Sequence, residues 1–138
     1  VGAKAGYIRL VIDGKWMIGA VTELATEYLA EISELVLEPS NNAKVTLAAE
    51  AMFTLLPAVV DDVTTSEIIY PQTRRVAAKH GFGGSAAIPL QDGGQPIGVI
   101  IIFDGGVRLF TEEETSSLIP LACQAVRALG TLANLNSK

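Results

Sequence analysis

Two runs near the N-terminus alternate apolar and polar side chains. Residues 7–12 carry large aliphatic side chains at every second position, and residues 15–21 repeat the pattern from Trp16 onward. A period of two residues is typical of a β-strand with one buried face. Asp13-Gly14 lies between the runs and suits the positive backbone angles of a tight turn. The sequence therefore predicts a β-hairpin.

The period changes after the second run. Between Thr22 and Leu37, apolar residues recur at steps of three and four, while the glutamates mostly fall off that stripe. This spacing predicts an amphipathic helix. Its apolar stripe consists of Leu24, Tyr28, Leu29, Ile32, Leu35 and Val36. The loop from Glu38 to Asn42 ends in residues that favour helix N-caps, and we expect a second helix from Ala43 to Thr54.

The middle of the chain is less regular. Ala58-Val59-Val60 follows a proline and predicts a short strand before the acidic pair Asp61-Asp62. From Thr64 to Gln72, polar and turn residues occur without a period, which indicates the longest loop of the domain. Residues 73–80 can form a short helix that ends at Gly81.

Two further strands and a long helix complete the pattern. Residues 85–90 and 95–103 flank the turn sequence Gln91-Asp92-Gly93-Gly94, and the second strand is apolar on both faces, which predicts a central place in a sheet. Thr111-Glu112-Glu113-Glu114 is a capping box that opens a long final helix. Because Pro120 lies inside that helix, we expect a kink there or a regular start near Ser117.

Several local motifs accompany this order of elements. They are, in chain order, Ala48-Ala49-Glu50-Ala51, Val59-Val60-Asp61-Asp62-Val63, Gly81-x-x-x-Ser85, Ala87-Ile88-Pro89-Leu90, Asp92-Gly93-Gly94, Ile97-Gly98-Val99-Ile100, Phe110-Thr111-Glu112-Glu113 and Leu121-Ala122-Cys123-Gln124-Ala125. In these motifs and in the order of its elements, the chain resembles the GAF family of regulatory domains. Together they extend the resemblance over residues 5–134. The chain departs from the family pattern at its start, where strand-like sequence begins at Tyr7 without the helix that precedes the first strand in many GAF domains.

The resemblance implies an α+β (mixed α/β) fold, a GAF-like central antiparallel sheet flanked by helices, with a long C-terminal helix. We expect a single domain over residues 1–138 that lacks the usual N-terminal helix. Its helices should pack on one side of the sheet, with a pocket under residues 64–84 on the other side.

The implied function is non-catalytic sensing of a small molecule within a larger signalling protein: a histidine kinase, a cyclase or phosphodiesterase, or a transcription regulator. Relatives signal through the final helix. Because the apolar residues from 118 to 133 cover a wide arc, we expect a homodimer through that helix, beside contacts with the output domains of the parent protein.

Composition narrows the range of partners. Apolar residues make up 49% of the chain and charged residues 18%, which is typical of a globular domain. The net charge is -5, and the one dense basic group, Arg74, Arg75 and Lys79, has the spacing of a solvated helix face, so we expect no nucleic-acid contact. The longest apolar stretches are too short to cross a bilayer, so we expect no membrane contact by this segment. The single cysteine, Cys123, favours a reducing, cytoplasmic compartment.

Candidate chemistry is sparse. With one cysteine, one histidine and no short acidic cluster with a third partner, we expect no metal site and no cofactor. Cys123 lies in an Ala/Leu-rich helix and is expected in the core, which argues against the methionine sulfoxide reductases of this fold, since these use several cysteines. No nucleophile lies beside a base, so the chain is not expected to be an enzyme. Two alternatives to small-molecule sensing stay open: a ligand-free dimerisation and signal-relay module, and a haem-based gas sensor that uses His80.

The ligand site is predicted in the long irregular stretch between two apolar strands, because such loops on a rigid scaffold commonly carry binding residues. Tyr70 offers an amphipathic ring, the two arginines can pair with an anionic group, and the histidine can donate or accept a hydrogen bond. The predicted ligand-binding residues are Asp62, Tyr70, Arg74, Arg75, His80 and Ser85. The competing interpretation is that these side chains face water and solubilise a lid.

Overall fold

The chain folds around one antiparallel sheet. The computed structural model describes residues 2–12, 15–33, 46–124 and 127. Its five strands follow the order β2-β1-β5-β4-β3, and every neighbouring pair is antiparallel. The elements are β1 (Ala5–Ile12), β2 (Lys15–Val21), a 3-10 turn η1 (Glu23–Ala25), α1 (Thr26–Ser33), α2 (Leu47–Thr54), β3 (Ala58–Val60), α3 (Pro71–His80), β4 (Ser85–Asp92), β5 (Gln95–Phe103) and α4 (Glu112–Ser117). The α+β class and the central antiparallel sheet flanked by helices are confirmed.

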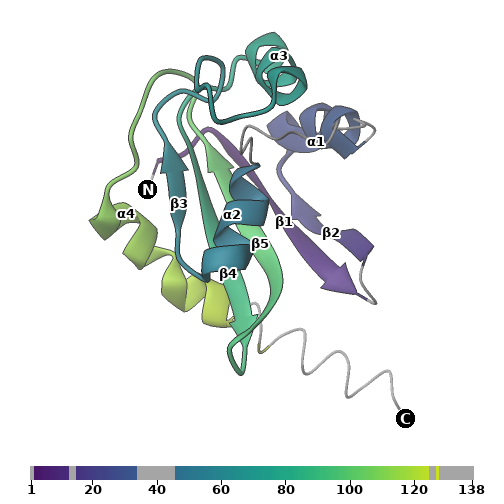
Figure 1. Cartoon of the computed structure of the whole chain (residues 1–138), viewed down its shortest axis with the longest axis vertical. Coiled ribbons are helices and arrows are strands. Elements are labelled where there is room, and N and C mark those ends of the chain that lie inside the picture. The colour runs from purple at the N-terminus through teal and green to yellow at the C-terminus, as the bar shows by residue number, and fades with distance from the viewer. Residues whose placement is uncertain (1, 13–14, 34–45, 125–126, 128–138) are drawn as a thin grey trace.

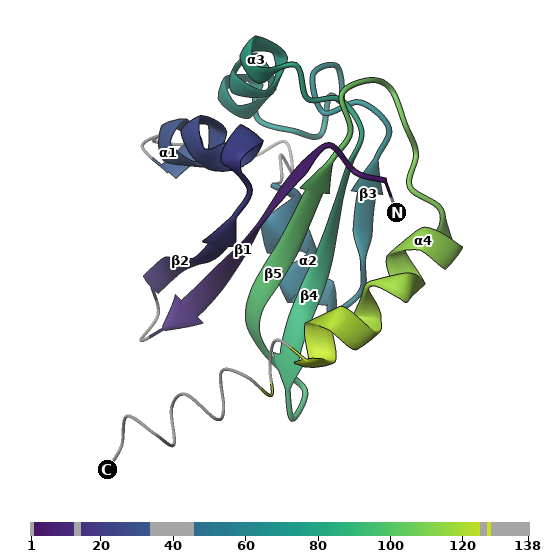
Figure 2. The same cartoon turned by 180° about the vertical axis from the view of Figure 1, so that it is seen from behind.

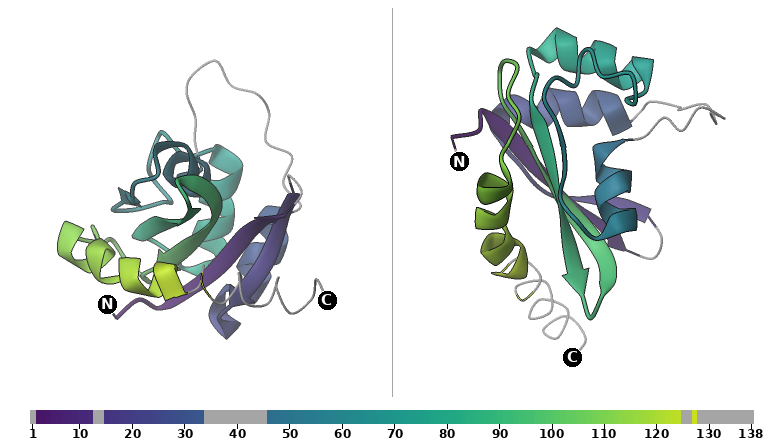
Figure 3. Two further views of the ribbon diagram at one scale, coloured as in Figure 1. Left: turned by 90° about the horizontal axis from the view of Figure 1, so that it is seen from below. Right: turned by 60° about the vertical axis from the view of Figure 1, so that its left-hand side comes forward.

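Helices cover both faces of this sheet. Helices α1, α2 and α3 lie on one face, and α4 with the helical turn that follows it lies on the other, as the view along the sheet edge shows (Figure 3). Figures 1 and 2 show these two faces in turn. The expectation that all helices share one side was wrong, because both faces of the central strands are apolar and each needs a cover.

The N-terminal hairpin of β1 and β2 is confirmed, and β1 begins two residues earlier than the alternation suggested, at Ala5. Ile8 pairs with Ala20 while Arg9 pairs with Ile18, so Gly19 is an extra residue on β2. Such a β-bulge bends the strand and redirects neighbouring side chains. The bulge therefore lies opposite the step from Ile8 to Arg9 on β1.

Strand β5 is the centre of the sheet, as its apolar sequence predicted. Val99 and Ile101 join the core cluster beneath α1, α2 and α3, while Ile100 joins the cluster beneath α4. The turn from β4 to β5 uses Gly93 and Gly94, with φ of +58° and +80°. Two successive positive angles are what a two-residue hairpin turn requires, and glycine adopts them without strain.

Helices α1 and α2 are described over part of the stretches that periodicity predicted. The first predicted helix is described as η1 and α1, and its residues 34–37 lie outside the described part, as does the loop 38–42. Leu24 is 57% exposed, so its assignment to the apolar stripe was wrong, because η1 turns that side chain outward. Helix α2 begins after Thr46, whose side chain accepts a hydrogen bond from the Ala49 amide at 3.2 Å; residues 43–45 of the prediction are outside the described part.

The short elements that follow largely match the sequence analysis. Strand β3 occupies residues 58–60 as predicted. Helix α3 begins at Pro71 rather than Thr73, because proline at the first helical position needs no partner for its nitrogen. It ends at Gly81, which has φ of +72°. The predicted loop is therefore shorter by its last two residues.

The final helix starts with the predicted capping box. The Thr111 hydroxyl accepts from the Glu114 amide at 3.1 Å, and the Glu114 carboxylate accepts from the Thr111 amide at 3.0 Å. The regular helix thus begins at Glu112, not near Ser117; it is interrupted at Leu118 and continues through 119–124. This interruption two residues before Pro120 is the expected kink. Residues 125–126 and 128–138 of the predicted long helix lie outside the described part.

Candidate ligand cavity

A cavity of about 320 Å³ lies between the sheet and the helices of the first face. Its floor comes from β1, β4 and β5, and its walls come from α1, the start of α2 and the segment that leads into α3. The residues that line it are Tyr7, Arg9, Tyr28, Ile32, Thr46, Leu47, Ala48, Ala49, Val63, Ile69, Thr73, Ser85, Ile101 and Phe103. This volume is at the lower end of the range for small-molecule pockets.

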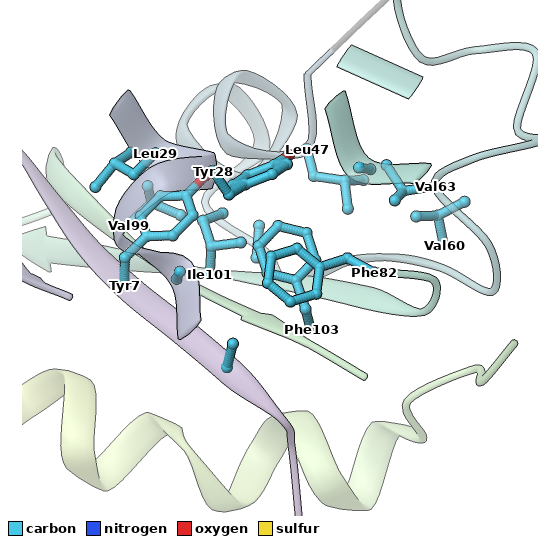
Figure 4. Close-up of a cluster of buried hydrophobic side chains, with 14 of the residues drawn as sticks. Tyr7, Tyr28, Leu29, Leu47, Val60, Val63, Phe82, Val99, Ile101 and Phe103 are labelled. Atoms are coloured by element: carbon cyan, nitrogen blue, oxygen red, sulfur yellow. The ribbon is translucent and has the colours of Figure 1, made fainter. Parts of the chain in front are cut away.

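Aromatic rings make the side of the cavity rigid. Phe103 stacks on Phe82 with ring centroids 4.7 Å apart and planes 11° from parallel. Tyr28 packs edge-on against both rings, 4.9 Å from Phe103 and 5.3 Å from Phe82. Figure 4 shows this group beside Ile101 and Val63. A preformed apolar wall of this kind can accept the apolar body of a ligand without rearranging.

Two buried tyrosines bring hydroxyl groups to this cavity. Tyr7 is 6% exposed and Tyr28 is 2% exposed. Burial raises the pKa of both phenols, so both hydroxyls stay protonated at neutral pH. Within the part of the chain that the structure describes, neither hydroxyl has a hydrogen-bond partner. Because buried tyrosine hydroxyls normally find a partner, two that face a cavity mark a place where a polar ligand group fits.

Arg9 is the charged side chain among the described residues of the lining. It follows Tyr7 by two positions on β1, so both side chains leave the same face of the sheet. Partial burial lowers the pKa of its guanidinium, and the neighbouring Tyr7 raises it by a smaller amount. Arg9 remains charged, because arginine does not lose its proton in proteins.

The N-terminus of α2 borders the same cavity, since Thr46 to Ala49 belong to its lining. The Ala49 amide is bound by the Thr46 hydroxyl and the Glu50 amide by the Thr46 carbonyl. The Leu47 and Ala48 amides precede the first hydrogen bond within the helix, so α2 itself leaves them unused. Aligned peptide dipoles add partial positive charge at this end.

The structure brings one of the six predicted site residues into the lining. Ser85 lies at the start of β4, is 1% exposed, and donates its hydroxyl hydrogen to the Ile102 carbonyl at 3.0 Å. The predicted segment from Asp62 to Gly84 also contributes Val63, Ile69 and Thr73 to the lining. The pocket thus lies under that segment, but on the face covered by α1, α2 and α3 instead of the face without helices that we had expected.

The other predicted residues lie outside the lining. Asp62 accepts from the Thr64 amide at 2.9 Å and its hydroxyl at 2.6 Å, which closes a local turn. Tyr70 is the N-cap residue of α3. Arg74 is half-buried with Nη1 3.5 Å from the Ser66 carbonyl, and Arg75 is exposed. Their role in binding stays a prediction.

His80 is held by another helix. Its Nε2 atom lies 2.8 Å from Oε1 of Glu31 on α1, and the same oxygen lies 3.0 Å from Nζ of Lys79. The imidazole also packs edge-on against Tyr28 at 6.0 Å. The histidine is therefore part of the contact between α1 and α3, behind the cavity wall.

The lining residues that were not predicted are Tyr7, Arg9, Tyr28 and those at the start of α2. The alternation in residues 7–12 places the aliphatic side chains on the buried face and leaves the opposite face to solvent. Both faces of β1 carry buried side chains, however: Tyr7 belongs to the core cluster beneath α1, α2 and α3, and Leu10 belongs to the cluster beneath α4. One signal in the sequence could have indicated these site residues. Tyr7 and Arg9 occupy alternate positions of one predicted strand, which places an aromatic ring and a cation on the same face.

A second hollow of about 410 Å³ lies at the β3 edge of the sheet and reaches the final helix. Leu56 and Ile119 in its lining are 64% and 46% exposed. Its other lining residues are Leu55, Pro57, Ile88, Pro89, Gln91, Gly93, Gly94, Ala122 and Cys123. Cys123 is exposed, so its expected place in the core was wrong. Ala122 takes that place because it faces the sheet.

The described residues lack two further kinds of feature. They contain no group of three His, Cys, Asp or Glu side chains placed to hold a metal ion. No helix among them has the length and apolar character needed to span a membrane.

The family model described as "GAF domain" matches residues 1–130 of the chain. No curated protein sequence matches it.

Three solved structures illustrate the structural similarity. The GAF domain region of a protein described as a membrane protein of Geobacter sulfurreducens PCA is 25% identical, with a TM-score of 0.70, over 95% of this chain and 83% of that one. A domain described as part of a two-component sensor histidine kinase of Sinorhizobium meliloti 1021 is 16% identical, with a TM-score of 0.73, over 99% and 86%. The type II free methionine-R-sulfoxide reductase of Thermoplasma acidophilum is 16% identical, with a TM-score of 0.56, over 87% and 74%.

Proposed function

The chain belongs to the GAF domain family, and from this premise we propose that it is a non-catalytic, small-molecule-sensing regulatory domain of a larger signalling protein. Its parent would be a histidine kinase, a cyclase or phosphodiesterase, or a transcription regulator. The expectation that it works in the cytoplasm rests on the single cysteine and stays a prediction.

One observation carries the sensing proposal: the cavity of about 320 Å³ combines an apolar wall with several polar groups that point into it. Pockets for small molecules in proteins are built in this way, with apolar surface for affinity and a few polar groups for orientation. The lining also draws on α1, α2 and the approach to α3 at once. A ligand held between them would change how these elements pack on the sheet.

The proposal excludes turnover by the domain. The reductase of the same fold shows that this architecture is compatible with catalysis. In this chain the one cysteine lies on the surface at the final helix, away from the lining of the cavity. The one histidine contacts Glu31 through Nε2 and does not line the cavity either. The described residues of the cavity lining include no His, Asp or Glu that could act as the base for a nucleophile.

A separate observation favours the relay alternative. Ile119 and Leu121 on the final helix are 46% and 49% exposed. Exposed apolar side chains on a terminal helix suit association with the same helix of a second copy. This association is compatible with ligand sensing, since a sensor must pass its signal to an output domain. The haem alternative gains no support, because His80 lies outside the lining.

Native mass spectrometry of the protein purified from its own host tests the sensing proposal. We expect a co-purifying small mass in the wild-type protein and its loss in Ala48→Leu, where the larger side chain fills the cavity. Ala78→Leu is the matched control, because Ala78 is exposed on α3 and does not line the cavity. No retained mass in wild type, or equal retention in both variants, would argue against the cavity as the sensing site. A Soret band in the visible spectrum would instead favour haem.

A further inference from the structure

Several polar side chains of the cavity lining already have a partner within the protein. The Ser85 hydroxyl donates to the Ile102 carbonyl at 3.0 Å, and the Thr46 hydroxyl accepts from the Ala49 amide at 3.2 Å. Arg9 likewise takes part in an interaction within the chain. The groups that a ligand can use are therefore sought elsewhere in the lining.

Tyr28 brings a hydroxyl to the start of α2. The residue is 2% exposed, and its hydroxyl has no hydrogen-bond partner among the residues that the structure describes. Burial raises the pKa of this phenol, so the hydroxyl keeps its proton and can donate it to a hydrogen bond. Figure 4 shows the ring extending from α1 toward Leu47, the first residue of α2, and both residues line the cavity. The donor thus lies beside the N-terminus of that helix.

The backbone adds two donors at the same place. The amides of Leu47 and Ala48 come before the first hydrogen bond within α2, and neither has a partner in the described part of the chain. Both residues belong to the lining of the cavity. Because buried donors are normally paired, a hydroxyl and two amides that lie together at a cavity indicate a ligand group that accepts hydrogen bonds.

We propose, on the basis of the sensing function above, that the cavity binds a small uncharged carbonyl compound, whose oxygen accepts from the Tyr28 hydroxyl and the first amides of α2. A carbonyl oxygen has two lone pairs and can accept more than one hydrogen bond. A carboxylate would also need a counter-charge, because burying an unpaired charge costs more than the partial charge of a helix N-terminus recovers. The wall of Val63, Ile101 and Phe103 then contacts the apolar body of the ligand.

The volume of the cavity limits the size of that body. An apolar cavity of about 150 Å³ accommodates benzene, so one about twice that size holds a compound of about ten non-hydrogen atoms. The cavity measures about 320 Å³. A single ring or a branched aliphatic chain therefore fits together with the carbonyl group.

Matched ketones and alkenes test this proposal. The pairs are acetophenone and α-methylstyrene, 1-cyclohexylethanone and isopropenylcyclohexane, and 4-methyl-2-pentanone and 2,4-dimethyl-1-pentene. Each alkene keeps the shape of its partner and replaces the carbonyl oxygen by a CH2 group. Titrations at pH 7 follow the methyl signals of Leu47, Val63 and Ile101 and the amide protons of Leu47 and Ala48. We expect both members of at least one pair to shift the methyl signals, and the ketone alone to move the amide protons downfield, because only the ketone accepts their hydrogen bonds.

The variant Tyr28→Phe then isolates the hydroxyl, because it removes the oxygen and keeps the ring. We expect the Kd of the ketone to rise about threefold to tenfold, the loss of one net hydrogen bond, while the Kd of the alkene stays unchanged. A purely structural role of Tyr28 would weaken both members of a pair equally. Thr65→Val is the matched control, since it removes a hydroxyl from an exposed residue outside the lining and should leave both affinities unchanged. If Tyr28→Phe does not fold, the amide protons of the wild-type protein still decide.

The outcomes separate this inference from the proposed function. Equal amide shifts with ketone and alkene, or an unchanged ketone affinity in Tyr28→Phe, would overturn the carbonyl site and leave the sensing function standing. Benzoate is titrated beside acetophenone, and tighter binding of benzoate would overturn the uncharged class. If none of the compounds shifts the cavity methyl signals, the carbonyl site is contradicted, and the co-purification experiment decides the sensing function by itself.

Discussion

Glu31 on α1 contacts His80 on α3 through one carboxylate oxygen, with Oε1 2.8 Å from Nε2. Lys79 reaches the same oxygen at 3.0 Å. The two helices are distant in sequence and both pack on the face that contains the cavity. Tyr28, one turn before Glu31, meets the imidazole edge-on and lines the cavity from its other side. The contact therefore fixes the helix that carries Tyr28 into the lining of the cavity.

The Glu31 contact should make stability depend on pH. Hydrogen bonds from Lys79 and then His80 lower the pKa of the Glu31 carboxyl below its usual value. A lowered folded-state pKa stabilises the protein above the ordinary carboxyl pKa, and this stabilisation is lost as pH falls through the lowered value. We expect Glu31→Gln to be less stable than wild type at pH 7, by an amount that shrinks as the pH is brought below the ordinary carboxyl range. Urea unfolding from pH 7 to pH 3 measures this difference.

The control for that series is Glu27→Gln, since Glu27 is exposed on the same helix. Its difference from wild type should stay small at every pH. A Glu31→Gln difference that does not change with pH would mean that the ionised carboxylate is not what stabilises the contact between α1 and α3.

A side chain at Gly84 should not fit. A Cβ at this position would overlap the carbonyl oxygen of Arg108, where the segment before β4 runs against the segment after β5. The backbone of the second segment must then move, and we expect Gly84→Ala to lower the free energy of unfolding by about 1–3 kcal/mol. At Gly106, in the same pair of segments, a Cβ would meet no atom within 4 Å. Chemical denaturation should show Gly106→Ala close to wild type, and equal effects of the two substitutions would contradict the close approach.

The capping box of α4 gives a prediction for the second face. Removing the Thr111 hydroxyl leaves the Glu114 amide without its side-chain partner. We expect Thr111→Ala to cost about 1 kcal/mol, and Thr111→Ser, which keeps the hydroxyl, to cost much less. Glu114 also pairs with Arg108, so the cap connects the segment after β5 to the final helix. Faster amide exchange over residues 112–117 in the alanine variant alone would support this connection, while identical exchange in both variants would contradict it.

Association through the final helix is expected to involve its exposed apolar side chains. Ile119→Lys and Leu121→Lys should shift the protein toward the monomer in sedimentation equilibrium if helices of two copies pair there. Val107 is 72% exposed outside that helix, and Val107→Lys is the control. A wild-type protein that is monomeric at high concentration with its flanking sequence restored would argue against the homodimer.

The fold was largely predictable from local patterns. The alternation in residues 7–21, the Gly93-Gly94 turn and the capping box each specify an element through short-range physics, and each element is present. Which face of each element is buried was harder to predict. Leu24 fits the helical stripe but lies on the 3-10 turn, and Cys123 lies in apolar sequence but points to solvent. Which face of an element is buried depends on its neighbours, and these belong to distant parts of the chain.

The candidate site was predicted only in part for the same reason. The segment that covers the cavity was identified, because long irregular stretches are visible in a sequence. Arg9 and Tyr28 were missed because their role depends on β1 and α1 meeting the start of α2 across the sheet. A charged residue on a strand looks solvent-exposed until the helices that pack over that face of the sheet are known.

The location of the ligand is tested most directly by methyl NMR of Ile, Leu and Val-labelled protein mixed with the small-molecule fraction of host cell extract. We expect shifts at Leu47, Val63, Ile69 and Ile101, which line the cavity, and none at Ile88, Leu90 and Ile100, which pack beneath α4. The Ala48→Leu variant should remove the shifts. Shifts confined to the second group, or no shift at any methyl group, would contradict the cavity as the sensing site of this GAF domain.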